Sequence, residues 1–484
     1  MFTSTRKQLQ LNASECIIKG ISDEGGLFIY NELDKFNFND SFINISYQEL
    51  SKKILKFFLN DFTDEEIEKV VKKSYNKDNF NKHIVKTKSC DNATFLELYH
   101  GPTMAFKDMA LTILPNLLKE SKEKNNNHKT TLILTATSGD TGGAALSGFG
   151  KADNTKIIVL YPTEGVSGFQ EAQMHYYTNK NALVYSVEGN FDDFQNLVKK
   201  IFTSNIKLNN LELSSANSIN IGRLVPQIIY YFYGYFQMVK NNEIKFGEKI
   251  NVCVPTGNFG NILACYISKE MGLYIDKIIC ASNENCVLTD FFTTYVYDKN
   301  RPFYVTNSPA MDILISSNLE RLLYLVTNNN TNEVNEMMAS LKENGTFTLK
   351  EEYRNKLNSF LATSINKEET KELIKKCFNE YNYLIDPHTA VGYGAYLKHK
   401  DNLKGKTLIA STASPYKFIE TVDEIFNTNK EGIDRINKIS EITNLEIPEI
   451  LKEIYSNNYK KEIWKKEEME DNLRKLIGEL DENC

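Results

Sequence analysis

Alternation of short apolar runs with helical segments is the feature that most constrains the fold of this chain. Between residues 95 and 281, runs of β-branched residues and leucine are separated by longer segments with helical patterns. Such runs predict strands buried on both faces, and their alternation with helices is typical of a parallel sheet. The sequence therefore predicts an α/β fold. The expected strands occupy residues 95–99, 130–135, 156–161, 182–187, 249–254, 277–281 and, much later, 406–410.

A glycine turn joins the strand expected at residues 249–254 to the helix expected at residues 262–271. Its central residues are Gly257, Asn258, Phe259, Gly260 and Asn261. A strand, a glycine turn and a helix in this order direct several backbone N–H groups to one point, where the helix dipole favours a phosphate. The turn lacks the Gly-Lys-Ser/Thr of a Walker loop and the Gly-x-Gly-x-x-Gly spacing of dinucleotide sites. The alternative is a plain strand-to-helix connection.

A second turn of the same architecture follows the strand at residues 130–135. It runs from Ser138 to Gly143 and carries more side-chain donors than the first, which suits a carboxylate better than a bare phosphate. A capped helix N-terminus without a ligand is the alternative. Thr412 follows the last expected strand, and parallel sheets present ligand-facing residues at their carboxyl ends.

Lys107 lies just after a Gly-Pro turn and opens a helical run at residues 109–118, which Pro115 is expected to kink. The neighbouring Ala105 and Phe106 lower the local polarity. Desolvation favours the neutral, nucleophilic form of an amine, so this placement suits covalent chemistry. The alternative is a solvated lysine at a helix start.

Composition limits the classes of function. The chain has 484 residues, enough for two or three domains, and its formal net charge of -6 argues against a nucleic-acid-binding protein. The 8 cysteines show no C-x-x-C pairs, so we expect neither a disulfide scaffold nor a metal site. We see no signal peptide, and the most apolar run, residues 228–239, is too short to span a bilayer. We therefore expect a cytoplasmic protein, without a membrane or nucleic-acid partner.

Several motifs together resemble threonine synthases of the long type. The lysine segment His100-Gly101-Pro102-Thr103-x-Ala105-Phe106-Lys107-Asp108 is similar to the cofactor-lysine motif of that family. Residues 135–142, 215–220 and 257–261 resemble its other signatures in the same order, and residues 4–6 and 23–28 resemble its N-terminal domain. The resemblance thus covers nearly the whole chain. The chain departs from the family at Ser414, where a histidine is common, and Asp140 stands where many relatives of this fold have asparagine.

The resemblance implies the architecture. We expect an α/β enzyme of fold type II, the tryptophan-synthase β-like fold that binds pyridoxal 5'-phosphate. Its two parallel-sheet lobes would occupy residues 96–425, and because the alternation of strands and helices breaks from Asn283, we expect a helical insertion at 283–345. A small α+β N-terminal domain is expected at residues 1–95 and a helical C-terminal extension at residues 426–484. The protein is expected to be a monomer or a small homo-oligomer.

The resemblance also implies the reaction and the roles of residues. The family converts O-phospho-L-homoserine and water to L-threonine and phosphate by γ-elimination and β-addition of water. Lys107 would bind the cofactor as a Schiff base and later move protons, and Thr412 would bond the pyridine nitrogen. The cofactor phosphate would lie on Gly257, Asn258, Phe259, Gly260 and Asn261. The substrate would bind at Thr137, Ser138, Gly139, Asp140, Thr141, Asn217, Ser218 and Arg223.

Residues 215–223 are the expected site of the substrate's own phosphate. Asn217 and Ser218 are expected to cap the following helix, and Arg223 can hold two phosphate oxygens with its planar fork. Two other functions remain open at this point. One is a threonine-synthase-like phospho-lyase that releases 2-oxobutyrate, and the other is a non-catalytic binding protein on the same scaffold.

Overall fold

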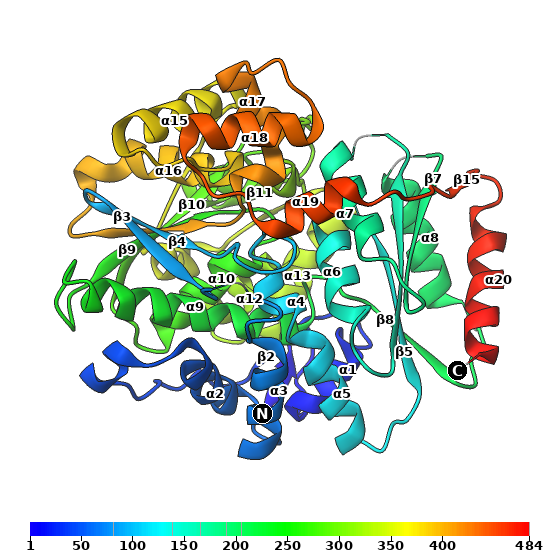
Figure 1. Ribbon diagram of the computed structural model, residues 1–484. Helices are drawn as coiled ribbons and strands as arrows, with labels where there is room; N and C mark the ends of the chain where they lie inside the picture. Colours follow the sequence, from blue (N-terminus) through cyan, green and yellow to red (C-terminus); the bar gives the residue numbers. More distant parts are fainter. Residues whose placement is uncertain (81, 138, 165, 190, 205, 484) are drawn as a thin grey trace.

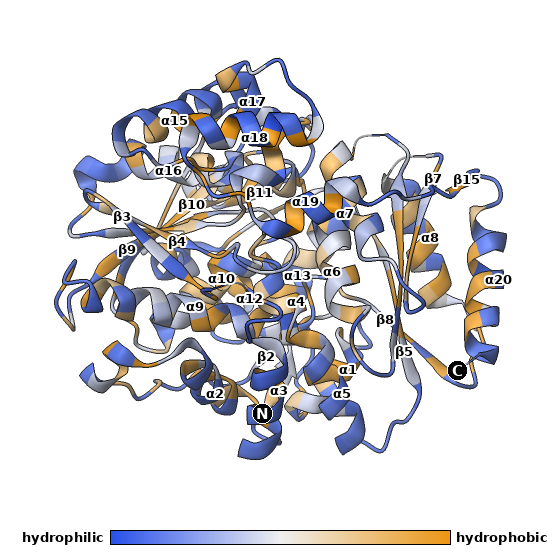
Figure 2. Ribbon diagram, viewed as in Figure 1, coloured by the Kyte–Doolittle hydropathy of each residue, from blue (hydrophilic) through white to orange (hydrophobic). Residues whose placement is uncertain are grey.

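The computed structural model describes residues 1–80, 82–137, 139–164, 166–189, 191–204 and 206–483. Two sheets covered by helices form the frame of this described part of the chain (Figure 1). We call them the six-stranded and the five-stranded lobe. Their strands are largely apolar, whereas outer helices such as α20 (Met469–Glu482) carry one apolar and one polar face (Figure 2). None of the helices in the described ranges has the length and apolar character that a membrane crossing requires.

The six-stranded lobe has the strand order β13-β10-β9-β14-β4-β3 among the described residues. All neighbours pair in parallel except β3 and β4, which are antiparallel, so the predicted parallel sheet carries one antiparallel edge strand. Its strands are β3 (Lys86–Cys90), β4 (Ala93–Glu97), β9 (Ile250–Pro255), β10 (Ile275–Ser282), β13 (Phe360–Ser364) and β14 (Thr407–Ser411). Its main helices are α4 (Asp108–Leu111), α9 (Ile221–Lys240), α10 (Gly260–Glu270), α15 (Lys367–Tyr381), α16 (Pro387–His399) and α17 (Ile419–Phe426).

The central strands of this lobe place three chain segments side by side. β14 lies between β4 and β9, and all three run in the same direction. The segments that follow them therefore leave the same edge of the sheet. These segments contain Lys107, Thr412 and the glycine turn at residues 257–261.

The five-stranded lobe is parallel throughout its described residues, in the order β15-β7-β6-β5-β8. Its strands are β5 (Thr130–Ala136), β6 (Thr155–Pro162), β7 (Ala182–Val187), β8 (Leu211–Ser214) and β15 (Ile463–Trp464), and its helices are α5 (Leu114–Lys124), α6 (Asp140–Phe149), α7 (Gly168–Tyr176) and α8 (Phe191–Thr203). The expected single helix at residues 109–118 is instead two helices, α4 and α5, because Pro115 occupies the first turn of α5.

The N-terminal region packs against α5 and α9 beneath both lobes (Figure 1). It contains the antiparallel pair β1 (Phe2–Ser4) and β2 (Phe28–Tyr30), with η1 (Asp40–Asn44), α1 (Ala13–Lys19), α2 (Tyr47–Phe58) and α3 (Asp64–Ser74). The expected domain limit at residue 95 falls inside β4, and the six-stranded sheet begins at Lys86.

The insertion at residues 283–345 contains α11 (Val287–Thr294), β11 (Val296–Asp298), η2 (Pro309–Met311), α12 (Leu319–Val326) and α13 (Thr331–Glu343). Its β11 pairs with β12 (Thr346–Thr348) and is followed by α14 (Glu351–Arg354) and η3 (Asn355–Leu357).

The C-terminal extension is mostly helical, as expected, with α18 (Gly432–Thr443), α19 (Glu449–Ser456) and α20 (Met469–Glu482). It also contributes β15, which the helical prediction missed because a two-residue strand has no periodicity. β15 pairs with β7, and the Trp464 ring stacks on Tyr185 with centroids 4.1 Å apart. The extension thus completes the edge of the five-stranded lobe (Figure 1).

Asp481 in α20 fastens the extension to the start of β8. Its carboxylate accepts hydrogen bonds from the backbone N–H groups of Asn209, Asn210 and Leu211 at 2.9, 2.8 and 2.7 Å. Burial alone would raise the pKa of this carboxyl, but the three donors outweigh it and hold the pKa below its usual value.

We predict that Asp481→Ala lowers the free energy of unfolding by about 2 kcal/mol, because charge-assisted hydrogen bonds are lost. The depressed pKa means that this contribution is present above about pH 4 and disappears as the pH falls further. Urea denaturation at pH 7 and at pH 3 measures both effects. Glu482→Ala, an exposed neighbour, is the matched control and should change stability little. Equal stability of Asp481→Ala and the natural protein at pH 7 contradicts this role.

Candidate active site

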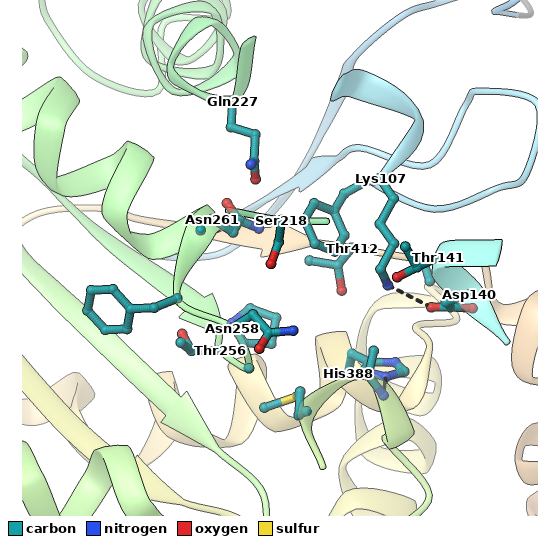
Figure 3. Close-up of a pocket in the computed structure, with 18 of the residues that line it drawn as sticks. Lys107, Asp140, Thr141, Ser218, Gln227, Thr256, Asn258, Asn261, His388 and Thr412 are labelled. Atoms are coloured by element: carbon teal, nitrogen blue, oxygen red, sulfur yellow. Dashed lines mark hydrogen bonds and ion pairs between the residues drawn. The ribbon is translucent and has the colours of Figure 1, made fainter. Parts of the chain in front are cut away.

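A pocket lies between the two lobes, at the carboxyl ends of β4, β9 and β14. Its lining includes Lys107, Asp140, Thr141, Asn217, Ser218, Arg223, Gly257, Asn258, Phe259, Gly260, Asn261 and Thr412, all of which the sequence predicted as site residues. Figure 3 shows Lys107 and Asp140 directed toward each other beside Thr412 and His388. The topology brings together Lys107 and Thr412, although they are 305 positions apart in the chain.

The turn at residues 103–108, which carries Lys107 and is called the lysine turn below, is bonded to the end of β14. Ala105 forms an isolated bridge with Ala413, and the backbone N–H of Phe106 donates to the Thr412 carbonyl at 2.8 Å. Asp108 closes the turn by accepting from the backbone and the hydroxyl of Thr103 at 2.8 and 2.6 Å. Lys107 is therefore held at a fixed position next to Thr412.

Lys107 is 9% exposed, and its Nζ lies 3.1 Å from Asp140 Oδ2. Burial lowers the pKa of the Lys107 ammonium, opposed by Asp140 and assisted by the charges of Lys417 and Arg223. Burial alone would raise the pKa of Asp140, but Lys107 and Lys417 hold it well below its usual range. The site therefore combines an ionised carboxylate with an amine that loses its proton more readily than a free lysine.

The turn at residues 257–261 has the geometry of an anion site. Phe259 has a left-handed backbone with φ 65° and precedes α10. Among the described residues, no acceptor is bonded to the backbone N–H groups of residues 257–261. A Cβ on Gly257 would lie 2.6 Å from the Ala310 carbonyl oxygen, so only glycine fits there. Asn261 accepts from Tyr230 and Tyr231, and its buried Nδ2 has no partner within the described chain.

Two of the predicted residues of the second turn shape it without lining the pocket. The Thr137 hydroxyl oxygen accepts from the backbone N–H groups of Gly139 and Gly142, both at 3.0 Å, which uses both of its lone pairs. Gly139 has φ 135°, and a Cβ there would lie 2.5 Å from Gln170 Oε1. Ser138, predicted to bind substrate, lies outside the described residues.

Arg223 is a buried cation at the other side of the pocket. It is 4% exposed, donates from Nη1 to the Ala216 carbonyl at 2.8 Å, and leaves Nε without a partner among the described residues. It forms no ion pair with any carboxylate that the structure describes. Burial lowers its pKa to about 10. A buried unpaired cation is unfavourable unless an anion joins it, so this position favours an anionic ligand.

One expectation about this segment is wrong. The cap of α9 is Asn220, whose Oδ1 accepts from the backbone N–H of Gly222 at 2.8 Å, and neither Asn217 nor Ser218 caps the helix. Asn217 Oδ1 instead accepts from the backbone N–H of Ser218 at 2.7 Å. This leaves Ser218 facing the pocket (Figure 3).

Some residues of the pocket were not predicted as site residues. His388 lines it, and its Nε2 accepts from the Ala310 backbone N–H at 3.2 Å while Nδ1 lies 2.8 Å from Asp386. This arrangement places the ring hydrogen on Nδ1. Gln227 also lines the pocket, at a helical position that carries no sequence signal for it. His100 bonds Glu97 and lies outside the pocket.

Comparisons with known proteins agree with this geometry. Residues 1–75 match the family model "Threonine synthase N terminus", and residues 89–414 match "Pyridoxal-phosphate dependent enzyme". The threonine synthase of Saccharomyces cerevisiae is 36% identical over 459 residues, covering 87% of this chain and 88% of that protein. This chain belongs to the threonine synthase family. The predicted resemblance and the fold-type-II architecture are thereby confirmed.

Solved and curated relatives extend this family assignment. The crystal structure of pyridoxal-phosphate-bound threonine synthase from Brucella melitensis is 32% identical, covers 98% of both chains and has a TM-score of 0.87. Human threonine synthase-like 1 is 37% identical over 431 residues, which is 84% of this chain and 57% of that protein.

The pocket of this threonine synthase family member fits pyridoxal phosphate. It offers a buried amine, a glycine turn with free backbone donors and, at Thr412, a hydroxyl that bonds no other described residue. In that order, these groups can bind the aldehyde, the phosphate and the ring nitrogen of pyridoxal phosphate.

We predict that borohydride reduction of the holoprotein attaches the cofactor to Lys107, because its buried amine is the nucleophile in the pocket. Peptide mapping by mass spectrometry locates the label. Lys107→Ala should remain folded but lose the label, and Lys122→Ala, a buried lysine outside the pocket, is the control that retains it. A label on Lys417, or on any lysine other than Lys107, contradicts the assignment.

Proposed function

We propose that this chain is a threonine synthase that converts O-phospho-L-homoserine and water to L-threonine and phosphate. The observation that carries the proposal is the presence of two anion sites around one buried amine. One is the glycine turn at residues 257–261, and the other is the unpaired guanidinium of Arg223. A phosphorylated cofactor needs the first, and a phosphorylated substrate needs the second.

Lys107, residues 257–261 and Thr412 would hold the cofactor. Lys107 supplies the amine, the backbone of residues 257–261 binds the phosphate at the start of α10, and the Thr412 hydroxyl donates to the ring nitrogen. When bound, pyridoxal phosphate supplies an electron sink for charge that develops next to the substrate's amino group. A hydroxyl does not favour protonation of the ring nitrogen as a carboxylate would, which suits a reaction in which charge moves to the β and γ carbons.

The substrate lies between the two lobes in this proposal. The backbone N–H groups of Asp140 and Thr141 at the start of α6 bind its carboxylate, while the Asp140 side chain stays paired with Lys107, and Ser218 and Arg223 bind its phosphate. Asn217 orients Ser218 through the bond between its Oδ1 and the Ser218 backbone. Lys107 Nζ carries protons at the α and β carbons, since it is the buried amine that faces the pocket. Arg223 stabilises the leaving phosphate during γ-elimination.

A phospho-lyase that releases 2-oxobutyrate, ammonia and phosphate is the second candidate. The similarity to human threonine synthase-like 1 keeps it open. Both reactions use the same residues and differ in whether water adds at the β carbon before the product leaves. A non-catalytic binding protein is disfavoured, because the lysine and both glycine turns are intact.

Incubation of the purified holoprotein with O-phospho-L-homoserine, followed by product analysis, distinguishes these candidates. We expect stoichiometric L-threonine and phosphate. Stoichiometric 2-oxobutyrate and ammonia would assign the phospho-lyase, and absence of turnover by fully loaded protein would contradict both enzymatic functions.

Arg223→Ala should lower kcat/KM for phosphohomoserine roughly a hundredfold, because one charge-assisted contact to the leaving phosphate is worth ~2–4 kcal/mol in the transition state. Arg223→Lys should recover only part of the loss, since it retains the charge but not the fork. Steady-state kinetics measures the effect. Arg474→Ala, on the outer helix α20, is the control. If Arg223→Ala has the same kcat/KM as the natural protein, the substrate's phosphate binds elsewhere.

The compartment and assembly of the enzyme are also part of this proposal. The seven cysteines in the described part of the chain are unpaired, and all but Cys286 are buried. This agrees with a reducing cytoplasm. We propose a monomer or a small homo-oligomer whose partner is the small-molecule substrate.

A further inference from the structure

Lys417 is a second buried lysine that lies behind the pocket. It is 0% exposed, belongs to the short helix η5 (Pro415–Phe418) after β14, and is not among the lining residues. Its ammonium donates to Gln173 Oε1 at 2.6 Å and to the Thr103 carbonyl at 3.0 Å, and it lies 3.3 Å from Asp140 Oδ1. All three of its protons therefore have an acceptor.

Asp140 is shared between the two lysines. Its Oδ2 faces Lys107 at 3.1 Å, while its Oδ1 faces Lys417 and also accepts from Gln170 Nε2 at 2.9 Å. Among the described residues, Asp140 is the carboxylate in ion-pair contact with both ammonium groups, so burial disfavours the state in which both lysines are charged. Lys107 has one hydrogen-bond acceptor in the described chain, against three for Lys417. An ammonium with fewer hydrogen-bond acceptors loses its proton more readily, and in this cluster that ammonium is Lys107.

We propose that Lys417 is a positioning residue: it holds the ionised Asp140 carboxylate in place and makes Lys107 the lysine that gives up its proton to become the nucleophile. Lys417 acts through Asp140 and touches neither the substrate nor the cofactor. Lys417 thus completes the lysine site as a fixed buried charge. This inference rests on the role that we propose for Lys107.

Other charged groups face this cluster from neighbouring elements. Arg223 on α9 acts on Lys107 with the same sign as Lys417, and Asp108 on α4 lies near Lys417. His388 on α16 faces Asp140, with its own ring bonded to Asp386. All of these groups remain when Lys417 alone is changed. A difference between variants at position 417 therefore reports the charge of Lys417.

The test measures how fast the full-length protein, freed of cofactor, is loaded with pyridoxal 5'-phosphate between pH 6 and pH 9. Removing the positive charge in Lys417→Met raises the pKa of Lys107, so a higher pH is needed to obtain the neutral amine. We expect the pH profile of the loading rate to move upward by about one unit, which is about a tenfold slower loading at pH 7. A purely structural role changes the loading amplitude or the melting temperature but does not move the profile.

Two variants serve as matched controls. Lys417→Arg retains the charge and should retain the natural profile. Lys122→Met removes a buried lysine that bonds the Lys129 carbonyl and Thr131 and lies outside the pocket, so its profile should also be unchanged. If Lys417→Met does not fold, Lys417→Gln carries the same test, because it retains polar contacts without the charge.

An unshifted loading profile in folded Lys417→Met or Lys417→Gln overturns the inference. The test involves no substrate, so its outcome is independent of whether the product is threonine or 2-oxobutyrate. Mapping the reduced label in the natural protein separates the two possible failures. A label on Lys107 with an unshifted profile contradicts only the role of Lys417, whereas a label elsewhere contradicts the cofactor-lysine assignment itself.

Discussion

The ion cluster of Lys107, Asp140 and Lys417 is the interaction on which the site depends. The two lysines follow strands of the six-stranded lobe, and Asp140 begins a helix of the five-stranded lobe. Buried charges are costly unless polar partners compensate for lost water. Gln170 and Gln173 on α7 supply such partners from the five-stranded lobe. The cluster thus links the relative position of the lobes to the protonation state of the reactive amine.

The order of three parallel strands explains why the other groups meet this cluster. β4, β14 and β9 are neighbours, so the lysine turn, Thr412 and the glycine turn before α10 leave one sheet edge together. The bond from the Phe106 backbone to the Thr412 carbonyl fixes the spacing between two of these segments. The insertion adds Ala310 and Met311 to the pocket wall. A cofactor with three separate polar groups can therefore be held by segments that are distant in the sequence.

The sequence predicted the strands and turns of the site well because their signals are local. Buried strands have β-branched runs, and the glycine turn needs glycine where Gly257 meets the Ala310 carbonyl. Contacts formed across the fold were not predictable in this way. Lys417 was missed because its partners come from α7 and from the lysine turn, and β15 was missed because its pairing with β7 decides its conformation. The cap of α9 was misassigned because Asn217, Ser218 and Asn220 are all capping residue types, and only the turn geometry selects Asn220.

The most direct test of the account is turnover of O-phospho-L-homoserine in water enriched in oxygen-18. γ-Elimination breaks the bond between carbon and oxygen, and the added water then forms a new bond at the β carbon. The account predicts L-threonine with oxygen-18 in its hydroxyl group and phosphate that acquires no oxygen-18 during the reaction. Oxygen-18 in the phosphate together with unlabelled homoserine would mean hydrolysis at phosphorus, and would contradict the proposed elimination and addition.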